Sequence, residues 1–275
     1  MRKLSLKEYY KLRRLVYRNA NALMVAIWRY DFENGNAEEI IDVLSCYQNE
    51  DGGFGHGLDG NCLNPNSTPY ITSMAVGIIE QYYPSADKEH PVLQGILHYL
   101  SSDNYATETG WLGMESIPSN NEYSHAPWFH YSPDAKRDEM DPQKAVSFIL
   151  KYGDKDSKLY QKVLLIDKAI SKEKQEPDFS NYSPSEFICW EIMPTDIVES
   201  PESPLYTKYK DLVDAELDGI VERLEKVERL PVPGVDNTAD WLDIPQIISC
   251  YPSTCNFFIM QLEILKRFNR LDFTL

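Results

Sequence analysis

The chain has 275 residues, which at roughly 150 residues per domain fits one large or two ordinary domains. A hydrophobic fraction of 43% with 25% charged residues is typical of a globular protein and excludes a disordered, collagenous or coiled-coil chain. Lysine and arginine number 27 against 43 aspartates and glutamates, for a net charge of −16. Because phosphate neutralisation requires clustered cations, this balance argues against a nucleic-acid partner.

The first 30 residues differ in charge from the rest of the chain. They contain eight lysines and arginines and one glutamate, and we expect them to form a basic N-terminal helix over 6–30. One interpretation is a surface for phosphate groups or anionic lipid. The other, which we favour, is a basic helix that lies against an acidic body. A salt-sensitive thermal stability would support the second interpretation.

Nothing near the start of the chain resembles a membrane span or a cleaved secretory signal. The apolar stretch over 22–28 is far shorter than the roughly 20 residues that a membrane helix needs. A basic, tyrosine-rich segment precedes it, unlike the short charged region of a signal peptide. We therefore expect a cytoplasmic protein without a membrane span. The five cysteines are an odd number without a CxxC pair, so we expect reduced thiols.

Helix start signals recur along the chain, and strand signals do not. Capping side chains precede proline or an acid in the first helical turn at Asn36, Thr68, Asp141 and Ser183. Behind them apolar residues recur every three or four positions. The helices expected in chain order are 6–30, 37–48, 69–83, 91–102, 142–152, 157–172, 184–193, 205–229 and 253–269. The pattern predicts an all-α protein.

A glycine-rich segment follows the predicted helix 37–48. It reads QNEDGGFG over 48–55, and five of the 13 glycines lie between Gly52 and Gly60, so we expect a tight turn with positive φ angles. Weaker echoes place aromatic residues at 54, 111, 179 and 241, at intervals of 57, 68 and 62 residues. Such an interval fits two helices and their loops, the unit that stacks into curved or closed arrays. We therefore expect one domain over 1–275, with helical-hairpin repeats over 31–275.

Segment 48–55 resembles the QxxDGGF/W repeat of the α/α toroid superfamily, which includes squalene-hopene-type terpene cyclases and protein prenyltransferase β subunits. With HGLD at 56–59, PNS at 65–67 and HAPW at 125–128, the chain is similar to a group of uncharacterised bacterial prenyltransferase-like proteins. The resemblance implies a partial or complete ring of helical hairpins around a cavity, with the glycine-rich loop at its mouth. It also implies that the Gln48 side chain bonds to backbone at a helix end and that Phe54 packs between hairpins.

The chain departs from the motifs that carry chemistry in that superfamily. The terpene cyclases protonate an alkene with a DxDD motif, which does not occur here; DEMD at 138–141 has methionine in place of the central acid. The local pattern of the Asp, Cys and His that hold zinc in protein prenyltransferases is not recoverable. The resemblance thus implies a fold and a cavity without assigning a reaction, because fold alone does not carry chemistry.

His56 and Asp59 are the candidate catalytic residues. A carboxylate three residues away could orient the imidazole for acid/base work near neutral pH. The alternative is that Asp59 caps a turn and His56 bonds to loop carbonyls. Asn66 precedes the helix that begins at Pro69, so we expect it at the cavity rim, where a helix N-terminus could receive an anionic or carbonyl ligand.

Three more residues are predicted to bind substrate: His125, Trp128 and Glu186. The first two lie in the polar-aromatic loop EYSHAPWFHY, which also contains His130. The two histidines are five residues apart with a proline between them, and this spacing gives little support to a metal site. We predict no metal and no cofactor, with zinc and magnesium left open.

Three functions fit these observations. The first is a prenyltransferase-like or terpene-cyclase-like enzyme, or a binding protein, with a hydrophobic small molecule such as an isoprenoid in an aromatic cavity. The second is a carbohydrate-processing glycosidase or lyase, with candidate acids that include Asp51, Asp59, Glu115 and Glu186. The third is a non-catalytic interaction scaffold with a broad concave surface. No phosphate-loop or dinucleotide fingerprint is present, which argues against ATP and dinucleotides.

Overall fold

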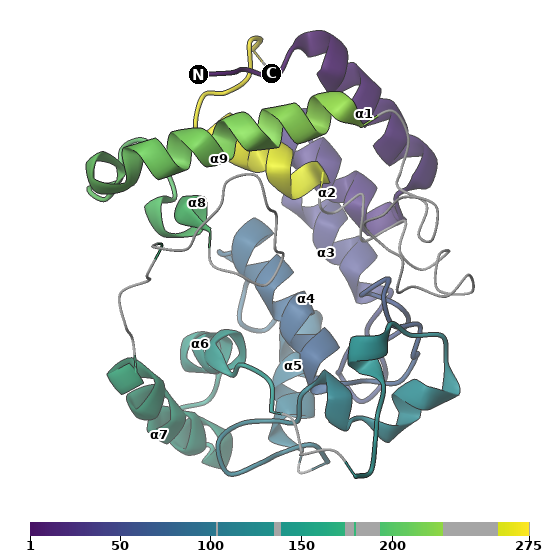
Figure 1. Cartoon of the computed structure of the whole chain (residues 1–275). Helices are drawn as coiled ribbons and strands as arrows, with labels where there is room; N and C mark the ends of the chain where they lie inside the picture. The colour runs from purple at the N-terminus through teal and green to yellow at the C-terminus, as the bar shows by residue number, and fades with distance from the viewer. Residues whose placement is uncertain (103, 135–138, 174–178, 180–192, 228–257, 275) are drawn as a thin grey trace. The chain divides into compact units, whose positions relative to one another are not determined.

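The computed structural model describes the chain except residues 103, 135–138, 174–178, 180–192, 228–257 and 275. The α-helices are α1 (Leu6–Asn19), α2 (Ala22–Phe32), α3 (Ala37–Ser45), α4 (Pro69–Tyr82), α5 (Pro91–Ser101), α6 (Gln143–Tyr152), α7 (Lys158–Glu173), α8 (Pro194–Val198) and α9 (Tyr206–Lys226), and residues 258–267 are also helical (Figure 1). Short 3-10 helices cover η1 (Met114–Ser116), η2 (Pro118–Glu122) and η3 (Pro127–Phe129). In these ranges extended backbone makes only isolated bridges, which confirms the all-α prediction. No described helix is both long and apolar enough to cross a membrane.

Several helices begin where their capping residues predicted. The side chain of Asn36 accepts a hydrogen bond from the backbone of Glu39 at 2.9 Å, and that of Thr68 accepts one from Ile71 at 3.3 Å. Each bond satisfies an amide that the first helical turn leaves without a backbone partner. These boundaries were predictable because the interaction that sets them spans only three residues.

The single helix expected over 6–30 is wrong. The chain forms two helices there, because the side chain of Asn21 accepts a hydrogen bond from the Met24 amide at 2.9 Å and so caps α2, while Ala20 adopts extended backbone. The helix expected over 184–193 lies outside the described residues except for Met193, which precedes α8, and α8 was not predicted.

The chain divides into two compact units. The central unit comprises Gly35–Lys174 and Val232–Ser253, and the terminal unit comprises Met1–Asn34, Gln175–Pro231 and Thr254–Leu275. The single toroid domain expected over 1–275 stays a prediction.

Helices of the central unit pack in succession: α3 against α4, α4 against α6, and α6 against α7. Their buried faces carry aliphatic and aromatic side chains at helical spacing. Examples are Ile40, Leu44, Ile71, Ala75, Ile79, Leu93, Ile96, Phe148 and Ile149. Burial of each larger side chain contributes about 1.5–3 kcal/mol, so packing between the helices supplies much of their stability.

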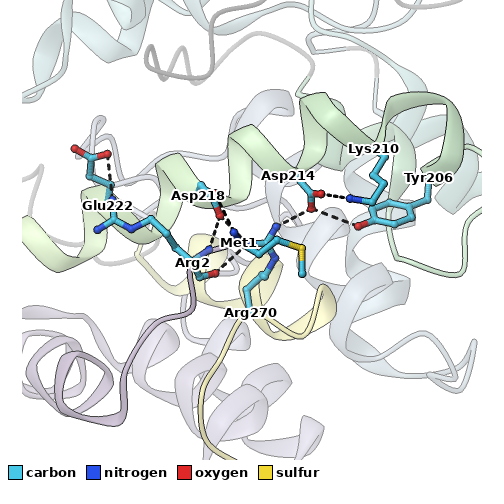
Figure 2. A network of polar contacts seen from close by, with 8 residues as sticks. All are labelled: Met1, Arg2, Tyr206, Lys210, Asp214, Asp218, Glu222 and Arg270. Atoms are coloured by element: carbon cyan, nitrogen blue, oxygen red, sulfur yellow. Dashed lines mark hydrogen bonds and ion pairs between the residues drawn. The ribbon is translucent and has the colours of Figure 1, made fainter.

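In the terminal unit, α9 packs against α1 and α8 and presents an acidic face with Asp214, Asp218 and Glu222 at four-residue spacing. Arg270, only 3% exposed, donates to Asp214 and Asp218 at 2.7 Å each (Figure 2). The backbone N–H of Arg2 donates to Asp218 at 2.7 Å, and its guanidinium donates to Glu222 at 3.3 Å. The basic residues Arg2 and Arg270 thus lie against the acidic face of α9.

The same helix carries a buried carboxyl group. Glu216 is 2% exposed and accepts hydrogen bonds from the backbone N–H of Thr195 at 3.0 Å and from its hydroxyl at 2.7 Å. Burial raises the pKa of Glu216 to about 7, because the bonds from Thr195 favour the charged form too weakly to offset desolvation. This group connects α9 to the first turn of α8.

Candidate functional site

The glycine-rich loop after α3 is held by the two residues to which the motif assigns structural roles. The side-chain amide of Gln48 donates to the Gly52 carbonyl at 2.9 Å and to the Val92 carbonyl, in the first turn of α5, at 3.0 Å. Phe54 is fully buried, and its backbone N–H donates to the Thr72 hydroxyl of α4 at 3.0 Å. The expected contacts of Gln48 are confirmed. The loop is therefore a structural joint between α3, α4 and α5.

Gly52 allows the loop to approach α5 closely. Its φ angle is +85°, a left-handed conformation that L side chains rarely adopt, and a Cβ atom there would lie 2.0 Å from the Gly95 carbonyl oxygen. The predicted positive φ angles are thus confirmed at Gly52 and also at Gly57, with φ +70°. This position tolerates only glycine, because both the backbone conformation and the missing space exclude a side chain.

The predicted catalytic residues are close in sequence but have separate partners. One carboxylate oxygen of Asp59 accepts from the backbone and side-chain amides of Asn61 at 2.9 and 2.8 Å. Nε2 of His56 lies 2.8 Å from the Asn49 carboxamide oxygen and donates to it, since that oxygen only accepts. Burial raises the pKa of Asp59. Asp59 therefore holds a turn, and no hydrogen bond joins it to His56 among the described residues; the catalytic role of the two residues stays a prediction.

The second predicted loop lies beside the first. The Leu63 N–H donates to the Ser124 carbonyl at 2.9 Å, and the Ala126 N–H donates to the Asn61 carbonyl at 2.8 Å. The structure thus brings His125 to Cys62, as the bridge between these two residues shows. Burial raises the pKa of the Cys62 thiol to about 11, so the thiol keeps its proton at neutral pH.

His125 and His130 form a pair that sequence reasoning placed in one loop without a contact. His125 Nδ1 donates to the Tyr123 carbonyl at 2.7 Å, and its Nε2 lies 3.2 Å from His130 Nδ1. The ring planes are 16° apart and the centroids 5.5 Å, which places the two nitrogens nearly in line between the rings. This geometry fits a hydrogen bond between the two nitrogens. It does not fit two nitrogens that both point at one metal ion. In the described ranges, no three potential metal-binding side chains gather.

The remaining predicted substrate-binding residues lie in different segments. Asn66 is exposed, and its backbone and side-chain amides both donate to the Asn64 carboxamide oxygen at 3.0 Å. Trp128 is half-buried in η3. Glu186 lies outside the described residues. The amides of Asn66 thus form hydrogen bonds within the loop at 48–66.

A groove that the sequence analysis did not select lies elsewhere in the central unit. It has a volume of about 810 Å³ between the start and outer face of α5 and the turn that joins α6 to α7. Its lining residues are Lys88, Glu89, Gln94, Leu97, His98, Ser101, Lys151, Tyr152, Gly153, Asp154, Lys155, Ser157 and Leu159. Three amines and one imidazole thus face a groove with two carboxylates. The charged run KYGDKDSK at 151–158 was the available sequence signal.

Hydrogen bonds connect the residues that form the groove wall. Ser157 accepts the Tyr160 N–H at 3.1 Å and so begins α7 at the groove. Lys151 donates to the Pro84 carbonyl at 2.7 Å, and the Gln94 amide donates to the Lys88 carbonyl at 2.6 Å. Lys155 is exposed, and its ammonium makes no hydrogen bond to a described residue. The groove thus offers a free amine beside a helix N-terminus, a combination suited to an anion.

No protein-family model matches the chain, and neither a curated protein nor a solved structure matches it.

Proposed function

We propose that the protein binds a small, polar, negatively charged molecule in the groove between α5 and the α6–α7 turn. The observation that carries the proposal is the gathering of Lys88, Lys151, Lys155 and His98 on one groove of a chain with net charge −16. An acidic protein repels anions at long range, so a local cluster of amines is needed to hold one. The volume of about 810 Å³ falls within the usual range for ligand sites.

We also propose that the helical hairpins of the central unit belong to a partial or complete α/α toroid. The support is the joint at Gln48 and Phe54, which links α3, α4 and α5 as the repeat motif requires. An isoprenoid ligand has less support than a polar one, because the groove is lined largely by charged and hydroxyl-bearing side chains. A glycosidase or lyase also has less support, since Asp51, Asp59 and Glu115, the expected acids that the structure describes, do not line the groove.

The test is calorimetric titration with glucose 6-phosphate, citrate and inorganic phosphate, with glucose as the uncharged control. We expect at least one anion to bind with a Kd below about 1 mM, and glucose not to bind. Lys155→Glu should weaken that binding at least about tenfold, because it reverses a groove charge. Lys168→Glu is the matched control, an exposed lysine of α7 outside the groove, and should change the Kd less than about twofold. Equal effects of both variants, or no binding of any anion, would refute the proposal.

A further inference from the structure

The terminal unit contains a separate cavity with aromatic walls. Its volume is about 330 Å³, and it is lined by Leu6, Tyr9, Tyr10, Arg13, Phe32, Glu33, Phe273 and Thr274. These residues come from α1, the end of α2 and the segment that follows residues 258–267. The volume is at the lower end for small-molecule sites and suits a ligand of about one ring.

The aromatic walls are built around Tyr9. Its ring centroid lies 5.1 Å from that of Phe273, 5.5 Å from that of Tyr10 and 6.2 Å from that of Phe32. On its other side it stacks on the fully buried Trp28, at 5.3 Å and 24°. Because the buried Trp28 and Phe32 both pack against the central ring, this part of the wall is formed before any ligand arrives.

Glu33, the one carboxylate among the described residues of the cavity lining, already has several hydrogen-bond donors. It accepts from Arg13 Nε at 2.5 Å, from the Tyr17 hydroxyl at 2.6 Å and from the Trp28 indole N–H at 2.8 Å. Burial raises the pKa of Glu33, but these three donors outweigh burial and hold the pKa below its ordinary value. This carboxylate is therefore charged, paired and poorly available to a ligand.

Two polar groups of the cavity, on Tyr9 and Arg13, can donate to a ligand. The Tyr9 side chain is 5% exposed, and its hydroxyl has no hydrogen-bond partner among the described residues. Burial raises its pKa to about 12, so the phenol keeps its proton. Among the described residues, Arg13 donates to Glu33 through Nε and one terminal nitrogen. Its other terminal nitrogen is left for a ligand. The ammonium of Lys266, 5.7 Å from the Phe32 ring centroid, adds positive charge nearby.

We propose that this cavity binds a small carboxylate with a single-ring or short apolar body. The body fills the space among Tyr9, Tyr10, Phe32 and Phe273, and the carboxylate accepts from the Tyr9 hydroxyl and from Arg13. Four aromatic side chains and an acid would also suit a quaternary ammonium group. The donors decide against that ligand, because Arg13 repels a cation and Glu33 has no capacity left to pair with one. This site is independent of the groove in the central unit.

Titration with three ligands of similar size tests the proposal. Phenylacetate is the expected ligand, benzyl alcohol lacks the charge, and benzyltrimethylammonium reverses it. We expect phenylacetate to bind at least about tenfold more tightly than either of the others and to shift the NMR signal of the Trp28 indole N–H, which is next to the cavity wall. Tighter binding of the ammonium, or no binding of phenylacetate at millimolar concentration, would overturn the proposal.

Variants locate the site and separate binding from folding. Arg13→Gln should weaken phenylacetate binding at least about tenfold and leave benzyl alcohol nearly unaffected. Tyr9→Phe keeps the ring and removes only the hydroxyl, so it should weaken phenylacetate about threefold to tenfold with unchanged circular dichroism. Arg14→Gln, at an exposed neighbouring position, is the control and should change nothing. If Arg14→Gln weakens phenylacetate as much as Arg13→Gln does, general electrostatic attraction explains the binding and the assigned site is wrong.

Discussion

Replacement of Glu216 by glutamine should remove a pH-dependent loss of stability in the terminal unit. The glutamate has an ordinary pKa of 4.5, and burial in the folded state raises it to about 7. Between these values the folded protein keeps a proton that the unfolded chain releases. Its contribution is therefore fully present below pH 4.5 and is lost as the pH rises toward 7.

The size of the effect follows from the two pKa values. They differ by roughly 2.5, and each pKa unit corresponds to about 1.36 kcal/mol, so the loss amounts to about 3 kcal/mol between pH 4.5 and 7. Glutamine stays neutral throughout. Its carbonyl can accept from the Thr195 N–H and its amide can donate to the Thr195 hydroxyl, so both contacts survive. Glu216→Gln should thus match the wild type near pH 4.5 and exceed its stability by about 3 kcal/mol above pH 7.

Urea unfolding followed by helical circular dichroism at several pH values between 4.5 and 8 measures this difference. All five histidines lie in the central unit and are unchanged in Glu216→Gln, so the comparison with the wild type isolates the glutamate. Glu222→Gln is the control on the same helix: Glu222 is exposed, its pKa is lowered, and its removal should leave the pH profile between 4.5 and 7 unchanged. If Glu216→Gln is less stable than the wild type at pH 8, the carboxyl group is not destabilised by burial and the reasoning fails.

Two further substitutions, one inside each unit, test close contacts by urea unfolding. Gly52→Ala should destabilise the central unit by about 3 kcal/mol, because it combines a positive φ with a Cβ atom 2.0 Å from a backbone oxygen; Gly57→Ala, with a positive φ but only a side-chain methyl at 3.1 Å, should cost about 1 kcal/mol. Similar losses at both glycines would contradict the close approach at Gly52. Arg270→Ala should cost about 3 kcal/mol, since it leaves two aspartates without their buried partner, whereas the exposed Arg267→Ala should cost less than about 0.5 kcal/mol. Equal losses for the two arginines would show that the buried network does not stabilise the unit.

Some contacts of the candidate sites join residues close in the sequence, and these were predicted; others join residues far apart, and these were not. The contacts of Gln48 were expected from the repeat motif, and the turn at Asp59 involves Asn61, only two residues away. The groove was not predicted, because Lys88 and Lys155 come together only through the placement of α5 beside the α6–α7 turn. The aromatic cavity likewise joins Tyr9 to Phe273.

The sequence by itself determined the helical class and most helix starts, because a capping side chain and the apolar period act within one or two turns. The break before Ala22 was also encoded locally, in the Asn21 cap, although the continuous helical pattern around it concealed the signal. Only the tertiary structure decided which charges are paired. Asp214 and Arg270 are 56 residues apart, so their ion pair depends on how α9 and the last helical segment pack, and no local propensity specifies that packing.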